Sequence, residues 1–202
     1  GEAFDKIARV LGLGYPGGPA LAAGARAGDA PRFPLPRALL GRKDCAFSFS
    51  GLKTAAATIA YEHVKTEQDR ADLCASVQAA IARQLVERSE RAMALFREQN
   101  SVSEPAFVVA GGVAANTAIR NALKALCEQN GFRFVAPPLK YCTDNAALIA
   151  LAGLEHFAAV SDMPHDLKAD MAARARPRWP LDEASARDAP VHKSAGRKGA
   201  KA

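Results

Sequence analysis

Apolar residues recur at helical spacing in two parts of the chain. Near the start, a helix over residues 1–11 would carry four of them on one face: Phe4, Ile7, Ala8 and Leu11. The same spacing extends from Gln68 to Gln99 and predicts one long amphipathic helix, broken at most once. The outer face of that helix is expected to lie in solvent and carries four charged residues: Arg83, Glu87, Arg88 and Arg91.

Alternation, proline and glycine predict the segments between these helices. Pro19 is expected to open a second short helix, because its fixed φ suits the first helical position. Residues 28–44 contain three prolines and no periodicity, which predicts an irregular surface loop. Residues 46–50 alternate in polarity and predict a strand that turns at Gly51 into an alanine-rich helix.

A strand, a glycine turn and a helix are predicted between Pro105 and Leu123. Residues 107–110 form a short apolar run, Gly111 and Gly112 break it, and Asn116 opens a helical pattern. Paired glycines let a ligand approach the backbone, and a helix start presents unpaired N–H groups. A phosphate or another oxyanion could bind there, and a plain connection between strand and helix is the alternative.

A second strand and a last helix complete the α/β pattern. The preceding helix ends at Gly131, residues 132–138 predict a short strand, and a helix begins near Asp144. Five residues form the apolar face of this last helix: Ala147, Leu148, Leu151, Ala152 and Leu154. Thr143 or Asp144 could cap the helix, or Asp144 could bind a metal, because ligands collect where strands end in α/β sheets.

The composition of the 202 residues, 49% of them hydrophobic, allows one sizeable core or one domain with appendages. No run approaches the ~18 apolar residues of a membrane span, and the start does not resemble a signal peptide. A soluble, intracellular protein is therefore expected. Because Gly1 stands where Met would, directly before a helix, the chain is expected to be part of a longer one. The four cysteines lack CxxC spacing and are expected to be inert thiols.

The net charge of +6 is concentrated at the end of the chain. Residues 166–202 carry nine Lys or Arg against five Asp or Glu, so they contribute +4. Such a tail is either a solvated appendage or a contact for a phosphate backbone. Trp179, between two prolines, is expected to pin the tail onto the domain.

Single polar and glycine positions leave alternatives open. Asp5, beside the apolar face of the first helix, either faces solvent or accepts hydrogen bonds from two sugar hydroxyls. Gly18 either contacts a ligand through its backbone or belongs to a plain loop. Ser48, Ser50 and Lys53 are expected to be cap and surface residues, because the GxSxG pattern of a nucleophilic serine is absent.

Five segments over about residues 1–183 resemble, in order, the bacterial tRNA adenosine threonylcarbamoyltransferase family, TsaD: GEAFDKIARVLGLGYPGGP, FSFSGLKTA, FVVAGGVAAN, YCTDNAALIA and RPRWPLDE. The resemblance implies an actin-like, Hsp70-like (ribonuclease H-like) two-lobed α/β ATPase fold. This chain would supply mainly the C-terminal lobe over residues 1–183, followed by a basic, disordered tail over residues 184–202. The implied enzyme is a cytoplasmic acyltransferase that moves the threonylcarbamoyl group of threonylcarbamoyl-AMP onto the exocyclic amine of adenosine 37 in tRNAs reading ANN codons.

Within these motifs, five residues of this chain correspond to the family's substrate-binding residues. Asp5 corresponds to the aspartate that holds the adenylate ribose, and Gly18 to a glycine of the same pocket. Gly111 and Gly112 correspond to the turn that faces the nucleotide, and Asn116 to its polar contact at the helix start. The resemblance also implies three partners, which are tRNA and the protein subunits TsaB and TsaE.

Asp144 corresponds to the family's metal-binding aspartate, which binds one divalent iron or zinc ion together with two histidines spaced HxxxH. That pair is absent here, because the four histidines are scattered: His63, His156, His165 and His192. The metal site and one wall of the pocket are therefore expected to be missing from this chain. No catalytic residue is assigned, and the chain alone is predicted not to turn over.

Three other functions compete with this interpretation. An actin-like sugar or acetate kinase lobe would share the glycine turn after a strand. A non-catalytic lobe could bind nucleotide or partner proteins. A metalloendopeptidase, the older description of the family, would need HExxH, which the sequence lacks.

Overall fold

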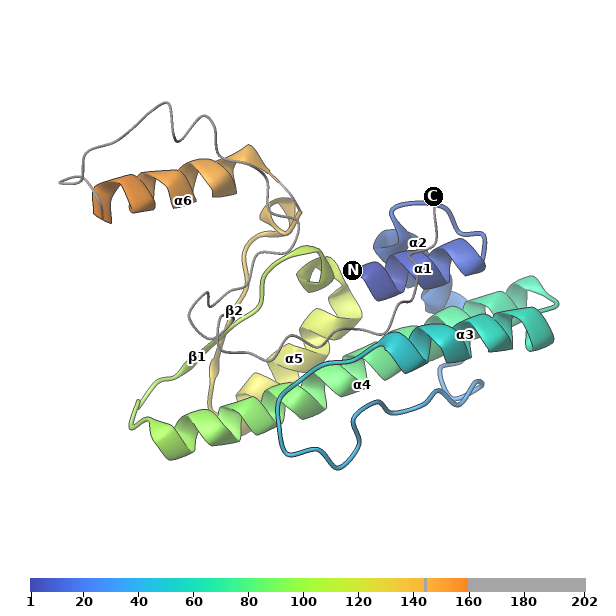
Figure 1. Cartoon of the computed structure of the whole chain (residues 1–202), viewed down its shortest axis with the longest axis horizontal. Helices are drawn as coiled ribbons and strands as arrows, with labels where there is room; N and C mark the ends of the chain where they lie inside the picture. The colour runs from blue at the N-terminus through green and yellow to red at the C-terminus, as the bar shows by residue number, and fades with distance from the viewer. Residues whose placement is uncertain (144, 160–202) are drawn as a thin grey trace, which may run out of the picture. The chain divides into compact units, whose positions relative to one another are not determined.

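The computed structural model describes residues 1–143 and 145–159, and Gly1–Gly153 forms one compact unit. Its helices are α1 (Glu2–Val10), α2 (Gly17–Gly24), α3 (Ser50–His63), α4 (Glu67–Gln99), α5 (Thr117–Asn130) and α6 (Ala146–Ala159) (Figure 1). Its strands are β1 (Ala106–Val108) and β2 (Arg133–Val135), and its 3-10 turns are η1 (Ala25–Ala27), η2 (Gly112–Ala115) and η3 (Leu139–Tyr141). In the second unit, Leu154–Ala202, the described residues are the last turns of α6.

Several residues and segments named in the sequence predictions lie outside the described residues. They include Asp144, His165, Trp179 with the RPRWPLDE motif and its end at Glu183, and the basic tail over 184–202 with His192. The mostly helical α/β character of the described part agrees with the predicted class. Among the described helices, none combines the length and hydropathy needed to cross a membrane.

Helix α4 is the central element of the first unit and contacts α2, α3 and α5 (Figure 1). It starts with a capping box, in which Thr66 Oγ1 accepts the Asp69 N–H at 3.1 Å and Asp69 Oδ2 accepts the Thr66 N–H at 3.0 Å. One side of the helix is buried in the core through Leu73, Val77 and Ile81. The predicted long helix is confirmed, and its 33 residues run without a break.

Helices α1 and α2 pack against each other at the start of the chain. The predicted apolar face of α1 is confirmed, since Phe4, Ile7 and Ala8 are buried. The predicted start of the second helix is wrong by two residues, because α2 begins at Gly17 rather than at Pro19. Pro19 fits inside the first turn, where no intrahelical N–H bond is required.

The two strands form a parallel pair with α5 as the crossover between them. Ala106 aligns with Arg133 and Val108 with Val135. Both strands were predicted, although β1 is shorter than the run over residues 107–110 and starts one residue earlier. Helix α5 ends as predicted at Gly131, whose φ of +66° is the left-handed conformation that glycine adopts without strain.

The strand predicted over residues 46–50 is wrong. Helix α3 begins at Ser50, so Gly51 lies inside a helix rather than at a turn. A strand would place Phe47 and Phe49 on one face, yet only Phe49 packs against the core and Phe47 stays half exposed. Among the described residues, β1 and β2 pair with each other, and the 46–50 segment has no strand beside it that could complete a ladder.

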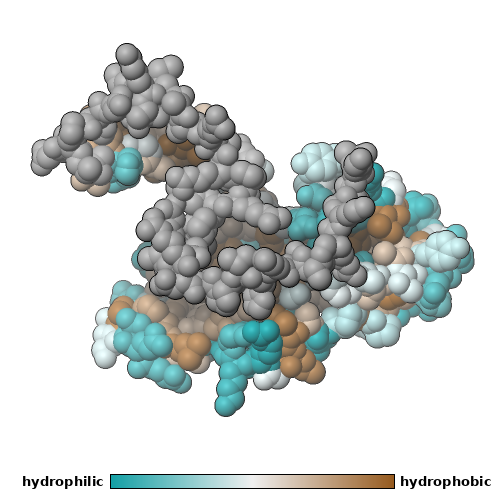
Figure 2. Space-filling view, viewed as in Figure 1, coloured by the Kyte–Doolittle hydropathy of each residue, from teal (hydrophilic) through white to brown (hydrophobic). Residues whose placement is uncertain are grey.

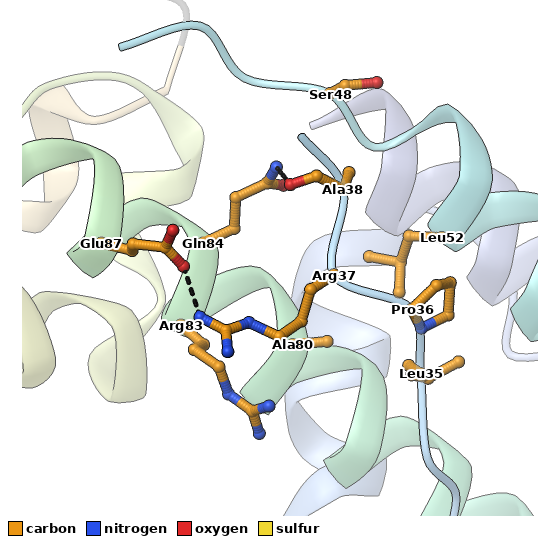
Figure 3. A pocket seen from close by; sticks show the side chains of 10 residues that line it. All are labelled: Leu35, Pro36, Arg37, Ala38, Ser48, Leu52, Ala80, Arg83, Gln84 and Glu87. Atoms are coloured by element: carbon orange, nitrogen blue, oxygen red, sulfur yellow. Dashed lines mark hydrogen bonds and ion pairs between the residues drawn. The ribbon is translucent and has the colours of Figure 1, made fainter. Parts of the chain in front are cut away.

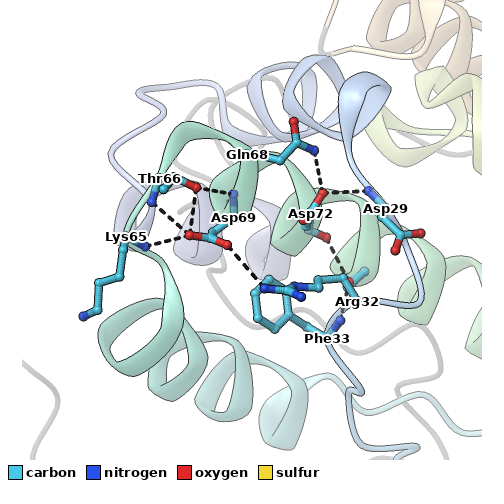
Figure 4. Close-up of polar contacts among 9 residues, drawn as sticks. Asp29, Arg32, Phe33, Lys65, Thr66, Gln68, Asp69 and Asp72 are labelled. Carbon is cyan, nitrogen blue, oxygen red and sulfur yellow. Dashed lines mark hydrogen bonds and ion pairs between the residues drawn. The ribbon is translucent and has the colours of Figure 1, made fainter.

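The loop over residues 28–44 is irregular, as predicted, but α4 holds its backbone closely. Asp72 Oδ1 accepts the Asp29 N–H at 2.8 Å (Figure 4), the Ser76 hydroxyl donates to the Ala30 carbonyl at 2.8 Å, and the Phe33 N–H donates back to Ser76 Oγ at 3.3 Å. Asp72 and Ser76 lie one turn apart on α4. A polar stripe on this helix therefore satisfies backbone groups of a segment that lacks secondary structure of its own.

Arg88 corrects the prediction that the outer charges of α4 lie in solvent. Its side chain is buried and donates to the carbonyl oxygens of Leu39, Arg42 and Asp44. Burying a guanidinium is costly unless its N–H groups are satisfied, and these three bonds from Nη1 and Nη2 offset part of that cost, while the buried Nε has no partner within the described residues. Glu87, predicted to be solvated as well, pairs with Arg37 at 2.8 Å.

The last helix differs from its prediction in its cap and its burial. The Leu148 N–H donates to Asn145 Oδ1 at 3.0 Å, so Asn145 caps α6 rather than Thr143, and the alternative cap Asp144 lies outside the described residues. None of its described residues is buried, including the five of its predicted apolar face.

All four cysteines are free thiols, in agreement with the sequence prediction. Cys74, Cys127 and Cys142 are buried, whereas Cys45 is only partly covered. Burial raises the pKa of Cys74 to about 11 and also raises that of Cys127. Both thiols therefore stay protonated and unreactive at neutral pH.

Candidate functional site

Asp5 and Gly18 come together at the junction of α1 and α2. The Gly17 N–H donates to Asp5 Oδ1 at 2.9 Å, and Gly18 follows directly in the chain. A side chain cannot replace the hydrogen at Gly17, because an added Cβ would lie 2.5 Å from Asp5 Cα and 2.8 Å from the Phe4 carbonyl oxygen. Asp5 is half-buried, and Oδ2 accepts no hydrogen bond within the described part of the chain.

A cavity of about 500 Å³ opens beside Asp5. The other residues that line it are Lys6, Arg9, Gly12, Gly14 and Tyr15. The Tyr15 side chain is 87% exposed and offers an open aromatic face, and Lys6 and Arg9 add two cations. Gly18 does not line this cavity, but an added Cβ there would meet no atom within 4 Å, so its backbone is open to a ligand.

Gly111, Gly112 and Asn116 form the second predicted group, after β1. Gly111 has a φ of +85°, which a residue with a side chain rarely adopts, and Gly112 begins η2. Asn116 caps α5, since its Oδ1 accepts the Ile119 N–H at 3.1 Å, and its Nδ2 donates to Gln78 Oε1 at 2.8 Å. The predicted helix start is thus confirmed, and Asn116 also ties that start to α4.

A cavity of about 380 Å³ is lined by sequence neighbours of both groups, although none of the five predicted substrate-binding residues lines it. Glu2 and Phe4 line it from α1, and Val113 lines it from η2. Val113 directly follows Gly112, and Phe4 directly precedes Asp5. The structure therefore brings the two segments near each other, although no hydrogen bond joins Asp5 to Asn116 within the described residues.

Lys53 joins α3 to the start of α1 at the edge of this second cavity. Its Nζ lies 3.0 Å from Glu2 Oε1, and Lys6 Nζ lies 2.7 Å from the same oxygen. Lys6 and then Lys53 lower the pKa of Glu2 to about 2. Ser48 and Ser50 also line the cavity, and neither is a cap as predicted, because α3 begins without a side-chain cap.

Asp144, the predicted metal ligand, lies outside the described residues. Within residues 1–143 and 145–159, no group of three or more His, Cys, Asp or Glu side chains is placed to hold a metal ion. The described residues therefore do not form a metal site by themselves, and Asp144 stays a prediction.

Arg120, which the sequence analysis did not single out, connects the segments around these groups. From the first turn of α5 its guanidinium donates to the Ala114 carbonyl at 2.8 Å and to the Pro137 carbonyl at 3.1 Å. It also lies 3.5 Å from Cys142 Sγ. A cation beside the positive end of a helix is unfavourable by itself. An arginine in the first turn of a predicted helix is therefore the sequence signal that could have pointed to Arg120.

A third hollow lies between the irregular loop and α4, and Figure 3 shows the residues around it. Arg37 pairs with Glu87, and Gln84 Nε2 donates to the Ala38 carbonyl at 3.4 Å. The hollow has about 20 Å³, which is room for roughly one water. It is too small for a nucleotide. On the face in Figure 2, hydrophilic and hydrophobic residues are interspersed, so surface hydropathy there does not mark a binding site.

Comparison with known proteins identifies relatives of the whole chain. The sequence profile of the family TsaD, tRNA N6-adenosine threonylcarbamoyltransferase, matches residues 1–151. A Caulobacter vibrioides protein of that name is 63% identical over all of this chain and 53% of the relative's length. Proteins of the same name from Maricaulis maris and Ruegeria pomeroyi are 56% and 52% identical, again over the whole chain and over 52% and 54% of their own lengths. The chain thus spans about half the length of the curated relatives that it matches.

Proposed function

Because the chain belongs to the TsaD family of tRNA N6-adenosine threonylcarbamoyltransferases, we propose that it is the C-terminal portion of an enzyme of this kind. The enzyme would transfer a threonylcarbamoyl group from threonylcarbamoyl-AMP to N6 of adenosine 37 in tRNAs that read ANN codons. The observation that carries this proposal is the family match over residues 1–151, a range that includes every described residue of the predicted site. The rest of the two-lobed actin-like fold would come from the remainder of the full-length polypeptide.

The α1–α2 junction is suited to hold the ribose of the adenylate. Asp5 Oδ1 is occupied by the Gly17 N–H, and Oδ2 is left to accept ribose hydroxyls. Gly18 N–H lies in the first turn of α2, where intrahelical acceptors are missing, and Pro19 has no N–H to offer. Gly18 therefore supplies the free backbone donor at this helix start, and Tyr15 offers a face on which an adenine could stack.

The turn after β1 is suited to contact the phosphate side of the nucleotide. Gly111 and Gly112 keep side chains away from the backbone, and the start of α5 carries a partial positive charge. Both polar atoms of Asn116 are already engaged, so we expect a ligand to use the second lone pair of its oxygen or the second hydrogen of its nitrogen.

A metal ion, iron or zinc, is part of the proposal only through Asp144 and two histidines from outside this chain. Such an ion would polarise the acyl or phosphate group when bound. The roles given above to Asp5, Gly18 and Asn116 do not depend on it.

The proposed partners follow from the proposed reaction. They are tRNA, threonylcarbamoyl-AMP and proteins like TsaB and TsaE, and the proposed location is the cytoplasm, where tRNA is used.

A threonylcarbamoyl-transfer assay tests this function. The full-length polypeptide that carries the chain is incubated with its partner subunits, tRNA and threonylcarbamoyl-AMP, and modified adenosine is quantified. We expect modification with the full-length protein and none with the 202-residue chain alone. Phosphoryl transfer to a sugar or to acetate by the full-length protein would instead support the kinase, and nucleotide binding without either reaction would support a non-catalytic lobe.

A further inference from the structure

Arg120 contacts three separate segments from one side chain. Its Nε donates to the Ala114 carbonyl of η2 at 2.8 Å, and its Nη2 donates to the Pro137 carbonyl after β2 at 3.1 Å. The same Nη2 lies 3.5 Å from Cys142 Sγ, just after η3. Cys142 is buried and its thiol also faces the carbonyls of Pro137 and Pro138 at 3.7 Å.

The surroundings of Arg120 do not explain it as an ordinary ion pair. No carboxylate among the described residues lies within ion-pair distance of its guanidinium. Its place in the first turn of α5 puts it beside the positive end of the helix, where a cation is disfavoured. The interactions that balance this cost are its hydrogen bonds to backbone carbonyls of neighbouring loops.

One of those loops contains the predicted glycine turn, and the other precedes the predicted metal ligand Asp144 in the sequence. Ala114 lies between Gly112 and Asn116, and Cys142 lies two residues before Asp144. An added Cβ at Gly112 would lie 4.0 Å from the Cys142 carbonyl oxygen, so the two backbones already pass close to each other.

We propose that Arg120 is a positioning residue, which holds the turn over Gly111–Asn116 against the segment that leads to Asp144. This inference rests on the proposed function, because it assigns the two loops to one substrate site. Arg120 acts through the backbones of Ala114 and Pro137 and needs no contact with substrate.

The geometry also predicts that lysine cannot replace Arg120. A guanidinium presents Nε and Nη2 in a fixed fork, and Arg120 uses one nitrogen for each loop. The lysine ammonium has three N–H donors, but all of them sit on one nitrogen at the end of a flexible stem, and it lacks a second donor atom held at a fixed distance. Arg120→Lys should therefore keep the charge and still lose the link between the loops.

The experiment compares Arg120→Ala, Arg120→Lys and wild type in the full-length polypeptide that carries this chain. Lys124→Ala is the matched control, because Lys124 is an exposed cation on α5 that pairs only at 3.8 Å with Glu128. The first readout is the alkylation rate of Cys142, located by mass spectrometry, with buried Cys74 and Cys127 reporting on the core. The second readout is kcat/KM for threonylcarbamoyl transfer.

In both Arg120 variants we expect Cys142 to be alkylated at least roughly tenfold faster than in wild type. We also expect kcat/KM to fall at least roughly tenfold, because misplaced loops no longer hold the substrate in its reactive geometry. Lys124→Ala should match wild type, and Cys74 and Cys127 should stay unreactive in every variant. Unchanged Cys142 reactivity, full rescue by lysine, or normal kcat/KM with an exposed Cys142 would each overturn the inference. An inactive wild type would contradict the proposed function instead. The Cys142 alkylation rates would still test whether Arg120 holds the two loops together.

Discussion

Asp5 combines a structural and a proposed binding role within one carboxylate. Oδ1 accepts the buried Gly17 N–H and joins α2 to α1, while Oδ2 is free of bonds within the described residues. The sequence left two alternatives for Asp5, solvent or sugar, and did not contain this third one. Spacing within one helix cannot reveal it, because the donor comes from a different helix.

Two substitutions of Asp5 separate these roles. Asp5→Asn keeps the Oδ1 acceptor, so its free energy of unfolding should stay within about 0.5 kcal/mol of wild type. Asp5→Ala leaves the Gly17 N–H unpaired and should lose about 1–3 kcal/mol. Urea unfolding of both variants measures the difference. Equal losses for the two variants would show that the hydrogen bond does not matter to stability.

Gly17 and Gly18 are neighbours with opposite constraints, which makes them a matched pair. Gly17→Ala would place its Cβ 2.5 Å from Asp5 Cα and should lower the free energy of unfolding by about 1–3 kcal/mol or more. Gly18→Ala meets no atom within 4 Å and should be neutral or slightly stabilising. Thermal unfolding of both variants decides between them, and comparable melting temperatures would mean that α1 and α2 do not pack this closely.

At the scale of elements, α4 does more than bury an apolar stripe. Its polar residues Asp72, Ser76 and Arg88 bind backbone groups of the loop over residues 28–44. This explains how a segment with three prolines and no periodicity keeps a defined path. The same residues would be read from the sequence as the solvated side of an amphipathic helix.

Arg88→Ala should release the loop at its end. Three carbonyl groups lose their donor, so we expect a loss of about 2–4 kcal/mol in the free energy of unfolding. Limited trypsinolysis should then cleave faster after Arg42 and Lys43, which lie in the released segment. Arg83→Ala, an exposed arginine on the same helix, is the control and should cleave like wild type. Unchanged cleavage in Arg88→Ala would contradict the anchoring role.

The tie between α1 and α3 should depend on pH through Glu2. Its pKa is lowered from 4.5 to about 2, first by the hydrogen bond from Lys6 and then by that from Lys53. Since the folded pKa is depressed, the pairing is fully present above about pH 4.5 and is lost as the pH falls through 2. NMR titration of the Glu2 carboxyl carbon measures this pKa. Lys53→Ala should raise it toward its ordinary value, and no change in that variant would mean that α3 does not hold Glu2.

At the scale of the whole molecule, the chain corresponds to about half of each relative reported above. The 380 Å³ cavity is lined by Phe4 and Val113, the sequence neighbours of Asp5 and Gly112, while Asp144 lies outside the described residues. A site completed by the rest of the polypeptide is consistent with the family and is the premise of the transfer assay.

The basic tail gives a prediction at this scale. Residues 184–202 hold five Lys or Arg and one Asp, and we propose that they contact the phosphate backbone of tRNA. Deleting Ala184–Ala202 from the full-length protein should weaken tRNA binding and flatten its salt dependence by roughly 3–4 in the slope of log K against log salt. Equal affinity and equal slope before and after the deletion would exclude this contact.

The sequence by itself determined the local order of the chain. Helical spacing placed α1 and α4, Asn116 and Gly131 marked the ends of α5, and the paired glycines marked the turn, because these features depend on neighbours in the chain. The prediction of a strand over residues 46–50 was wrong because a strand needs a neighbouring strand to bond its backbone groups, and local alternation of polarity does not show whether one is present.

Only the tertiary structure decided which polar groups meet across segments. Arg88 and Arg120 donate to carbonyl groups of distant loops, and Asp5 accepts the N–H of another helix. A backbone donor or acceptor carries no mark in the sequence, since nearly every residue has both. The residues that hold this site together therefore became visible only once the chain had folded.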